Sequence, residues 1–220
     1  MEIAVTSALG LVTRAVRNFE KDGKPASAVT LTRLYDTSAD DLWDALTSKE
    51  RIPRWFLPIE GDLEQGERYQ LEGNAGGTIT ACTPTQHFAA TWEFGGGMSW
   101  IEVSVAAEQG KARLTLEHIA LIEEHWNQFG PGAVGIGWDL AVAGLSRYLA
   151  TGAPTDRAEA EAWMGSLEGR DAMRHSGELW RAAHVASGVD AASAKERSNR
   201  TIAFYLGETP PDAAHPGTGS

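Results

Sequence analysis

Residues 67–119 decide the fold of this chain: ERYQLEGNAGGTITACTPTQHFAATWEFGGGMSWIEVSVAAEQGKARLTLEHI. Segments with strand-forming composition recur along this stretch, at 67–72, 78–83, 88–94, 99–106 and 112–119. Gly-rich or Pro-containing turns separate them, and each turn is too short to carry a crossover connection. Short strands joined by tight turns predict an antiparallel meander.

The chain before this stretch predicts a hairpin followed by short helices. Segments 9–18 and 28–35 can both extend, and the Asp-Gly pair at 22–23 is a strong hairpin turn signal between them. A helix is expected after Ser38, whose side chain can cap it. The sequence Thr-Ser-Lys-Glu at 47–50 has the form of a capping box, which predicts a second short helix towards Trp55.

The chain after the meander is expected to be helical. Residues 133–150 place apolar side chains on one helical stripe, formed by Val134, Trp138, Ala141, Val142, Leu145 and Leu149. A curved sheet must cover its inner face, and one long helix cannot fill the concavity. We therefore predict an α+β fold, a curved antiparallel sheet wrapped around a long helix with an apolar cavity between them. The expected domains are this sheet-and-helix domain at 1–152, a helical extension packed on it at 153–206, and a disordered tail at 207–220.

Composition excludes several classes of function. The 220 residues carry a net charge of -11, which argues against nucleic acid and anionic membranes as partners, since both need clustered cations. Cys82 is the only cysteine, so an intramolecular disulfide is impossible, and its place in a predicted strand favours a structural thiol. Neither a signal peptide nor an apolar run of about 20 residues is present, so we expect a cytoplasmic protein without membrane insertion.

Several short motifs resemble a known family. They are LTRLYD at 31–36, LWDALT at 42–47, RWF at 54–56, TWEF at 91–94 and GWDL at 137–140. Over residues 9–150 the chain resembles the bacterial branch of the Hsp90 ATPase activator homologue-like group, within the START/polyketide cyclase (SRPBCC, Bet v 1-like) superfamily. The resemblance implies the helix-grip fold. Superfamily members bind lipids, hormones or polyketides, and some are cyclases or hydrolases. The eukaryotic activators carry a separate N-terminal domain with a chaperone-stimulating motif that this sequence lacks, so an Hsp90-like chaperone is not the expected partner.

The candidate ligand contacts are aromatic and polar residues of the expected inner faces. A buried indole most often only packs, but Trp92, Trp100 and Trp138 are candidates for stacking on a flat ligand. Strand alternation places Glu102 on the face of Trp100, and His118 continues the alternation of Leu114 and Leu116. The full set is Trp55, Phe56, Trp92, Trp100, Glu102, His118 and Trp138. The sequence predicts neither a metal site nor a cofactor nor a nucleophile motif.

Three functions remain open at the level of sequence. The leading hypothesis is a module that binds a small hydrophobic or aromatic ligand between the sheet and the long helix. The second is a cyclase or hydrolase that uses His118 or Glu102 as a general acid or base. The third is a chaperone- or stress-related protein-interaction role, or a homodimer, in which the helical tail with Trp163 and Trp180 contacts a partner. Of these, we expect binding rather than catalysis.

Overall fold

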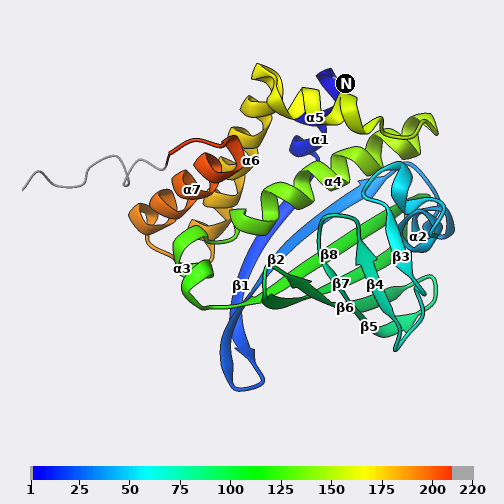
Figure 1. Ribbon diagram of the computed structural model, residues 1–220, viewed down its shortest axis with the longest axis horizontal. Helices are drawn as coiled ribbons and strands as arrows, with labels where there is room; N and C mark the ends of the chain where they lie inside the picture. The colour runs from blue at the N-terminus through cyan, green and yellow to red at the C-terminus, as the bar shows by residue number, and fades with distance from the viewer. Residues whose placement is uncertain (1, 210–220) are drawn as a thin grey trace, which may run out of the picture.

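The computed structural model describes residues 2–209 and contains one curved antiparallel sheet with helices on its concave side (Figure 1). The eight strands are β1 (Thr13–Lys21), β2 (Lys24–Tyr35), β3 (Ile59–Gly61), β4 (Arg68–Leu71), β5 (Gly76–Thr83), β6 (His87–Phe94), β7 (Gly97–Glu108) and β8 (Lys111–Leu121). They lie in the order β1-β2-β8-β7-β6-β5-β4-β3, and all neighbours are antiparallel. The predicted meander is confirmed as β4 to β8, and the hairpin of β1 and β2 extends it beyond β8.

The helices are α1 (Glu2–Gly10), α2 (Ala39–Thr47), the single 3₁₀ turn η1 (Ile52–Arg54), α3 (Glu124–Phe129), α4 (Gly132–Thr151), α5 (Arg157–Gly165), α6 (Leu167–Ala186) and α7 (Ala191–Leu206). The long helix α4 crosses the concave side of the sheet. The helices α1, α5 and α6 lie on the side of α4 that faces away from the sheet (Figure 1). This arrangement is the predicted α+β helix-grip fold with a C-terminal helical segment.

Local sequence signals explain where most elements begin and end. The turn between β1 and β2 places Asp22 at φ 52° and Gly23 at φ 74°, the left-handed conformations that the Asp-Gly signal predicts. Ser38 caps α2 as expected, because its side chain accepts a hydrogen bond from the backbone N–H of Asp41 at 3.1 Å.

Several expectations for the shorter elements are wrong. Leu9 and Gly10 end a helix rather than open a strand, so β1 starts four residues later, at Thr13. The predicted capping box at 47–50 does not form: Thr47, its expected cap, is the last residue of α2, and its hydroxyl donates to the backbone carbonyl of Trp43 at 2.8 Å. The three-residue β3 and the short α3 have no clear sequence signal. The predicted disordered tail, 207–220, falls largely outside the described residues.

The helix α4 is buried on two sides. Trp138 lines the cavity together with residues of the sheet, while Gly135 and Asp139 contact α6. At Gly135 an added Cβ would lie 2.4 Å from the indole of Trp180, so only glycine allows this approach. The same core cluster contains Trp180 and residues of the sheet, so the C-terminal helices and the sheet bury one continuous core.

Candidate functional site

A cavity of about 280 Å³ lies between the concave face of the sheet and the helices α2, η1 and α4. Its volume is close to the lower end of the range for small-molecule sites, which starts at about 300 Å³. Aromatic side chains make up much of its wall: Trp43, Trp55, Phe56, Tyr69, Phe88, Trp92 and Trp138. They come from α2, the segment after η1, the strands β4 and β6, and α4, so the fold brings together residues almost a hundred positions apart.

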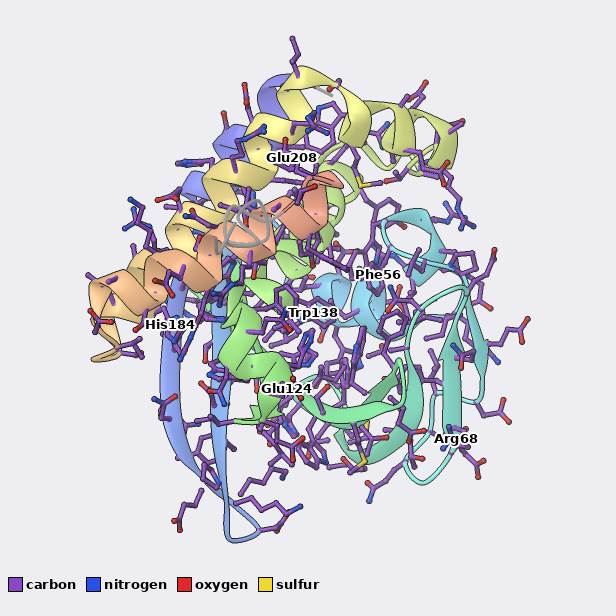
Figure 2. All side chains as sticks on the ribbon, turned by 60° about the vertical axis from the view of Figure 1, so that its left-hand side comes forward. Phe56, Arg68, Glu124, Trp138, His184 and Glu208 are labelled. Atoms are coloured by element: carbon purple, nitrogen blue, oxygen red, sulfur yellow. The ribbon has the colours of Figure 1, made fainter. Side chains whose placement is uncertain are left out.

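Four of these rings form one continuous aromatic wall. Trp55 stacks on Phe56 with centroids 5.4 Å apart, and Phe56 stacks on Trp138 at 5.9 Å. Trp138 then contacts Trp92 across the cavity floor at 5.1 Å with an interplanar angle of 57°. Figure 2 shows Phe56 and Trp138 next to each other between the helices and the sheet. We call Trp55, Phe56, Trp138 and Trp92 the aromatic wall.

A chain of buried hydrogen bonds, called here the polar relay, holds the indole of Trp138 in place. The indole N–H of Trp138 donates to Nδ1 of His118 at 3.0 Å, so Nδ1 must be unprotonated. The proton of the neutral ring therefore sits on Nε2, which donates to the Ser99 hydroxyl at 2.9 Å. Ser99 in turn donates to the backbone carbonyl of Trp92 at 3.2 Å, so every group of the relay has a partner.

Burial keeps this imidazole neutral. His118 is 2% exposed, and desolvation lowers its pKa to about 3. Protonation would also place an N–H on Nδ1 directly opposite the N–H of Trp138. His118 contacts the aromatic wall but does not line the cavity. Both ring nitrogens are bonded to protein groups, so His118 orients Trp138 rather than presenting a polar atom to the cavity.

Four of the seven predicted contacts line the cavity, namely Trp55, Phe56, Trp92 and Trp138. Trp100 and Glu102 lie on the opposite face of β7, because Ile101 and Val103 point inward and alternation turns their neighbours outward. The sequence pattern correctly paired Trp100 with Glu102 on one face but assigned that face to the wrong side of the sheet.

The outward residues have their own partners. The ammonium of Lys21 lies 4.6 Å from the ring centroid of Trp100, and Glu102 lies 3.9 Å from the imidazole of His87. Trp100 packs beside Phe19 over the small residues of β2. This outer cluster is separated from the cavity by the sheet itself.

Sequence reasoning missed Cys82 as a cavity residue. A β-bulge shifts the register of β5 between Ile79 and Ala81, so Ile79 and Cys82 both line the cavity although three positions separate them. Simple alternation would place them on opposite faces. Trp43 was also missed: it enters from α2 and meets the edge of Phe88 at 6.1 Å. Its place on the inner face of the amphipathic helix α2 does not by itself distinguish a core residue from a cavity residue.

Two further carboxylates on these elements, Glu93 and Asp139, do not line the cavity. Glu93 pairs with Arg68 on the outer face at 2.9 Å, and this hydrogen bond lowers the pKa of Glu93 (Figure 2 labels Arg68). Asp139 points from α4 towards α6, where it accepts hydrogen bonds from Arg14, Ser176 and Trp180. Burial raises the pKa of Asp139, and these donors oppose that shift.

Two further properties bear on the function. Within residues 2–209, no group of three or more His, Cys, Asp and Glu side chains is placed to hold a metal ion. In the same part of the chain, no helix is both long enough and apolar enough to cross a bilayer.

The fold and the cavity define a helix-grip domain of the START/polyketide cyclase (SRPBCC) superfamily. Within it, the sequence profile described as "Activator of Hsp90 ATPase homolog 1-like protein" matches residues 36–150, just over half of the chain. The chain belongs to this family. No curated protein matches it.

Solved structures agree with this assignment. CalU16 from Micromonospora echinospora is 28% identical to this chain; its solution structure aligns with a TM-score of 0.70 over 80% of this chain and 96% of CalU16. The crystal structure of CalU16 aligns with a TM-score of 0.65 over 78% of this chain and 97% of CalU16. EF2215 from Enterococcus faecalis, a conserved protein of unknown function, is 16% identical and shares the fold, with a TM-score of 0.55 over 82% of this chain and 96% of EF2215.

Proposed function

We propose that this protein binds a small hydrophobic or aromatic molecule in the cavity between the sheet and α4. The aromatic wall is the observation that carries the proposal. A protein core normally fills its volume with interlocking side chains, whereas here several large rings border open space. Stacking faces of this kind favour a flat apolar ligand.

A cyclase or hydrolase reaction is the weaker candidate. A general acid or base must come within hydrogen-bond distance of the group whose proton it moves. Both ring nitrogens of His118 already have protein partners, and Glu102 lies on the outer face of β7. The positions of His118 and Glu102 therefore support ligand binding better than they support catalysis.

A protein-interaction role for the helical tail also has less support. Trp180 is fully buried and donates to Asp139 at 3.1 Å, and Trp163 packs against the cluster of α1 and α4 residues that includes Leu9 and Ala143. The tryptophans of the tail are thus engaged within the chain. We propose that the segment 153–206 is an integral part of the helix-grip domain rather than a separate docking module.

The binding proposal is tested by native mass spectrometry of the gently purified protein, followed by variants of the aromatic wall. We expect a discrete added mass on the wild type and its loss in Trp92→Ala and in Trp138→Ala. Trp100→Ala is the matched control, because it removes the same side chain from the outer face. Circular dichroism establishes that each variant is folded. Equal retention of the added mass by all three variants would contradict the proposal.

A further inference from the structure

The cavity wall carries no ionised side chain among the described residues that line it. Its polar side chains are the hydroxyls of Thr47 and Tyr69, the thiol of Cys82 and the indole N–H groups of its tryptophans. A buried ligand must find its hydrogen bonds and any counter-charge within this set, because an unpaired charge in an apolar site carries a large desolvation cost.

Most of these polar groups already form hydrogen bonds within the protein. Thr47 donates its proton to the carbonyl of Trp43 at 2.8 Å, and Tyr69 donates to the carbonyl of Thr91 at 2.7 Å. Two of the indoles are also engaged, since Trp55 donates to the carbonyl of Ala45 and Trp138 donates to His118. The two hydroxyl oxygens can therefore only accept a further hydrogen bond.

The indole N–H groups of Trp43 and Trp92 and the weakly donating thiol of Cys82 are the donors of the wall that have no protein acceptor among the described residues. A neutral N–H can satisfy a carbonyl or ether oxygen of a ligand. It leaves the full charge of a carboxylate or a phosphate uncompensated, because such groups are normally matched by Arg or Lys.

Of the cations close to the cavity, Arg51 and Lys49 are paired with carboxylates, whereas Arg54, next to Trp55 in the chain, is exposed and donates to the backbone carbonyl of Glu50 at 3.3 Å. Arg51 contacts the carboxylates of Asp41 and Asp44 at 2.9 Å and 2.8 Å. Lys49, beyond the end of α2, lies 3.6 Å from Asp62. Neither side chain lines the cavity.

The rim adds negative charge. Ile59 and Leu63 line the cavity, and the residues next to them in the chain include Glu60, Asp62 and Glu64, all exposed. An anionic group close to these two wall residues would meet the exposed carboxylates of Glu60 and Glu64, in a protein whose net charge is already -11.

We propose that the cavity selects uncharged aromatic molecules and excludes those bearing a carboxylate, phosphate or sulfonate, fatty acids and phospholipids among them. The selection rests on the proposed binding function and names the ligand class of the same site. The wall causes this selection against charged ligands, because the polar groups that it offers to a ligand are neutral donors and acceptors.

A matched pair of fluorescent probes tests this selection on the full chain. N-phenyl-naphthylamine is neutral, and anilinonaphthalene sulfonate is nearly the same molecule with one added sulfonate; both brighten in apolar surroundings. We expect the neutral probe to saturate the protein and the sulfonate to bind at least about 100-fold more weakly, because its charge would be buried unpaired. The difference should persist at high salt, since salt screens exposed charges far more than buried ones.

A gain-of-binding variant locates the cause. Leu63→Lys places one cation in the cavity wall and should raise sulfonate affinity at least about 10-fold, as expected for one new buried ion pair. Glu64→Gln is the matched control: it changes the net charge by the same amount next to the wall and should leave the affinity within about 2-fold, as an exposed charge contributes little.

Each outcome separates this inference from the binding proposal beneath it. If neither probe binds the wild type, the proposed function itself fails. If both probes bind with similar affinity, binding stands and the charge selection is overturned. If high salt restores sulfonate binding, or Glu64→Gln raises it as much as Leu63→Lys, the acidic rim is the source and the assignment to the wall is overturned.

Discussion

Acidification should destabilise this protein through His118, and the size of the effect follows from its burial. The folded state keeps the imidazole neutral, with a pKa of about 3, while an unfolded chain titrates near 6.5. Between these values the unfolded state binds a proton that the native state does not, so the free energy of unfolding falls as the pH falls. Each pH unit removes about 1.4 kcal/mol, so His118 alone should cost about 2 kcal/mol at about pH 5.

Urea denaturation of the wild type and of His118→Asn, near neutral pH and at about pH 5, isolates this contribution. The asparagine oxygen can still accept the N–H of Trp138, but the residue does not titrate. The variant loses packing at both pH values, whereas only the wild type loses the protonation contribution. We expect the stability gap between the two proteins to narrow by about 2 kcal/mol at the lower pH.

A gap that stays constant between the two pH values would refute the reasoning. It would mean that His118 takes up a proton in the native state as readily as in the unfolded chain. Burial and a neighbouring arginine also lower the pKa of His184, to about 4, so that residue destabilises in the same direction. Both proteins in the comparison retain His184, so its contribution cancels.

Three further outcomes are expected from equilibrium denaturation. Asp139→Asn should cost about 3–5 kcal/mol, because it leaves the buried Arg14 guanidinium without its carboxylate; a loss below about 1 kcal/mol would exclude the pair as the tie between β1 and α4. Removal of 153–220 should abolish cooperative unfolding, since it opens the shared core; a stable, monomeric remainder would instead make the extension a separate module. Gly135→Ala should cost about 1–3 kcal/mol, since its Cβ would lie 2.4 Å from a buried indole. The control Gly165→Ala meets no atom within 4 Å and should be neutral or stabilising; equal losses in both variants would contradict the close approach.

The local signals of the sequence determined the elements that depend on near neighbours. The Asp-Gly turn at 22–23 and the Ser38 cap form through interactions within a few residues, and the meander follows from strands joined by tight turns, so all three can be predicted without knowledge of the fold. The motifs shared with the family predicted the helix-grip fold into which these elements assemble. Wrong predictions occurred where local signals were ambiguous, as at 47–50, where Thr47 could open a new helix but instead ends α2.

Only the tertiary structure decided which face of each element meets the cavity. Alternation defines two faces of β7 but cannot say which one the sheet turns inward, and this assigned Trp100 and Glu102 to the wrong side. A single β-bulge in β5 turns Cys82 towards the cavity wall. The indole N–H of Trp138 on α4 donates a hydrogen bond to His118 on β8. These outcomes depend on sheet curvature and on contacts between residues far apart in the chain, which leave no mark on the sequence near the residues concerned.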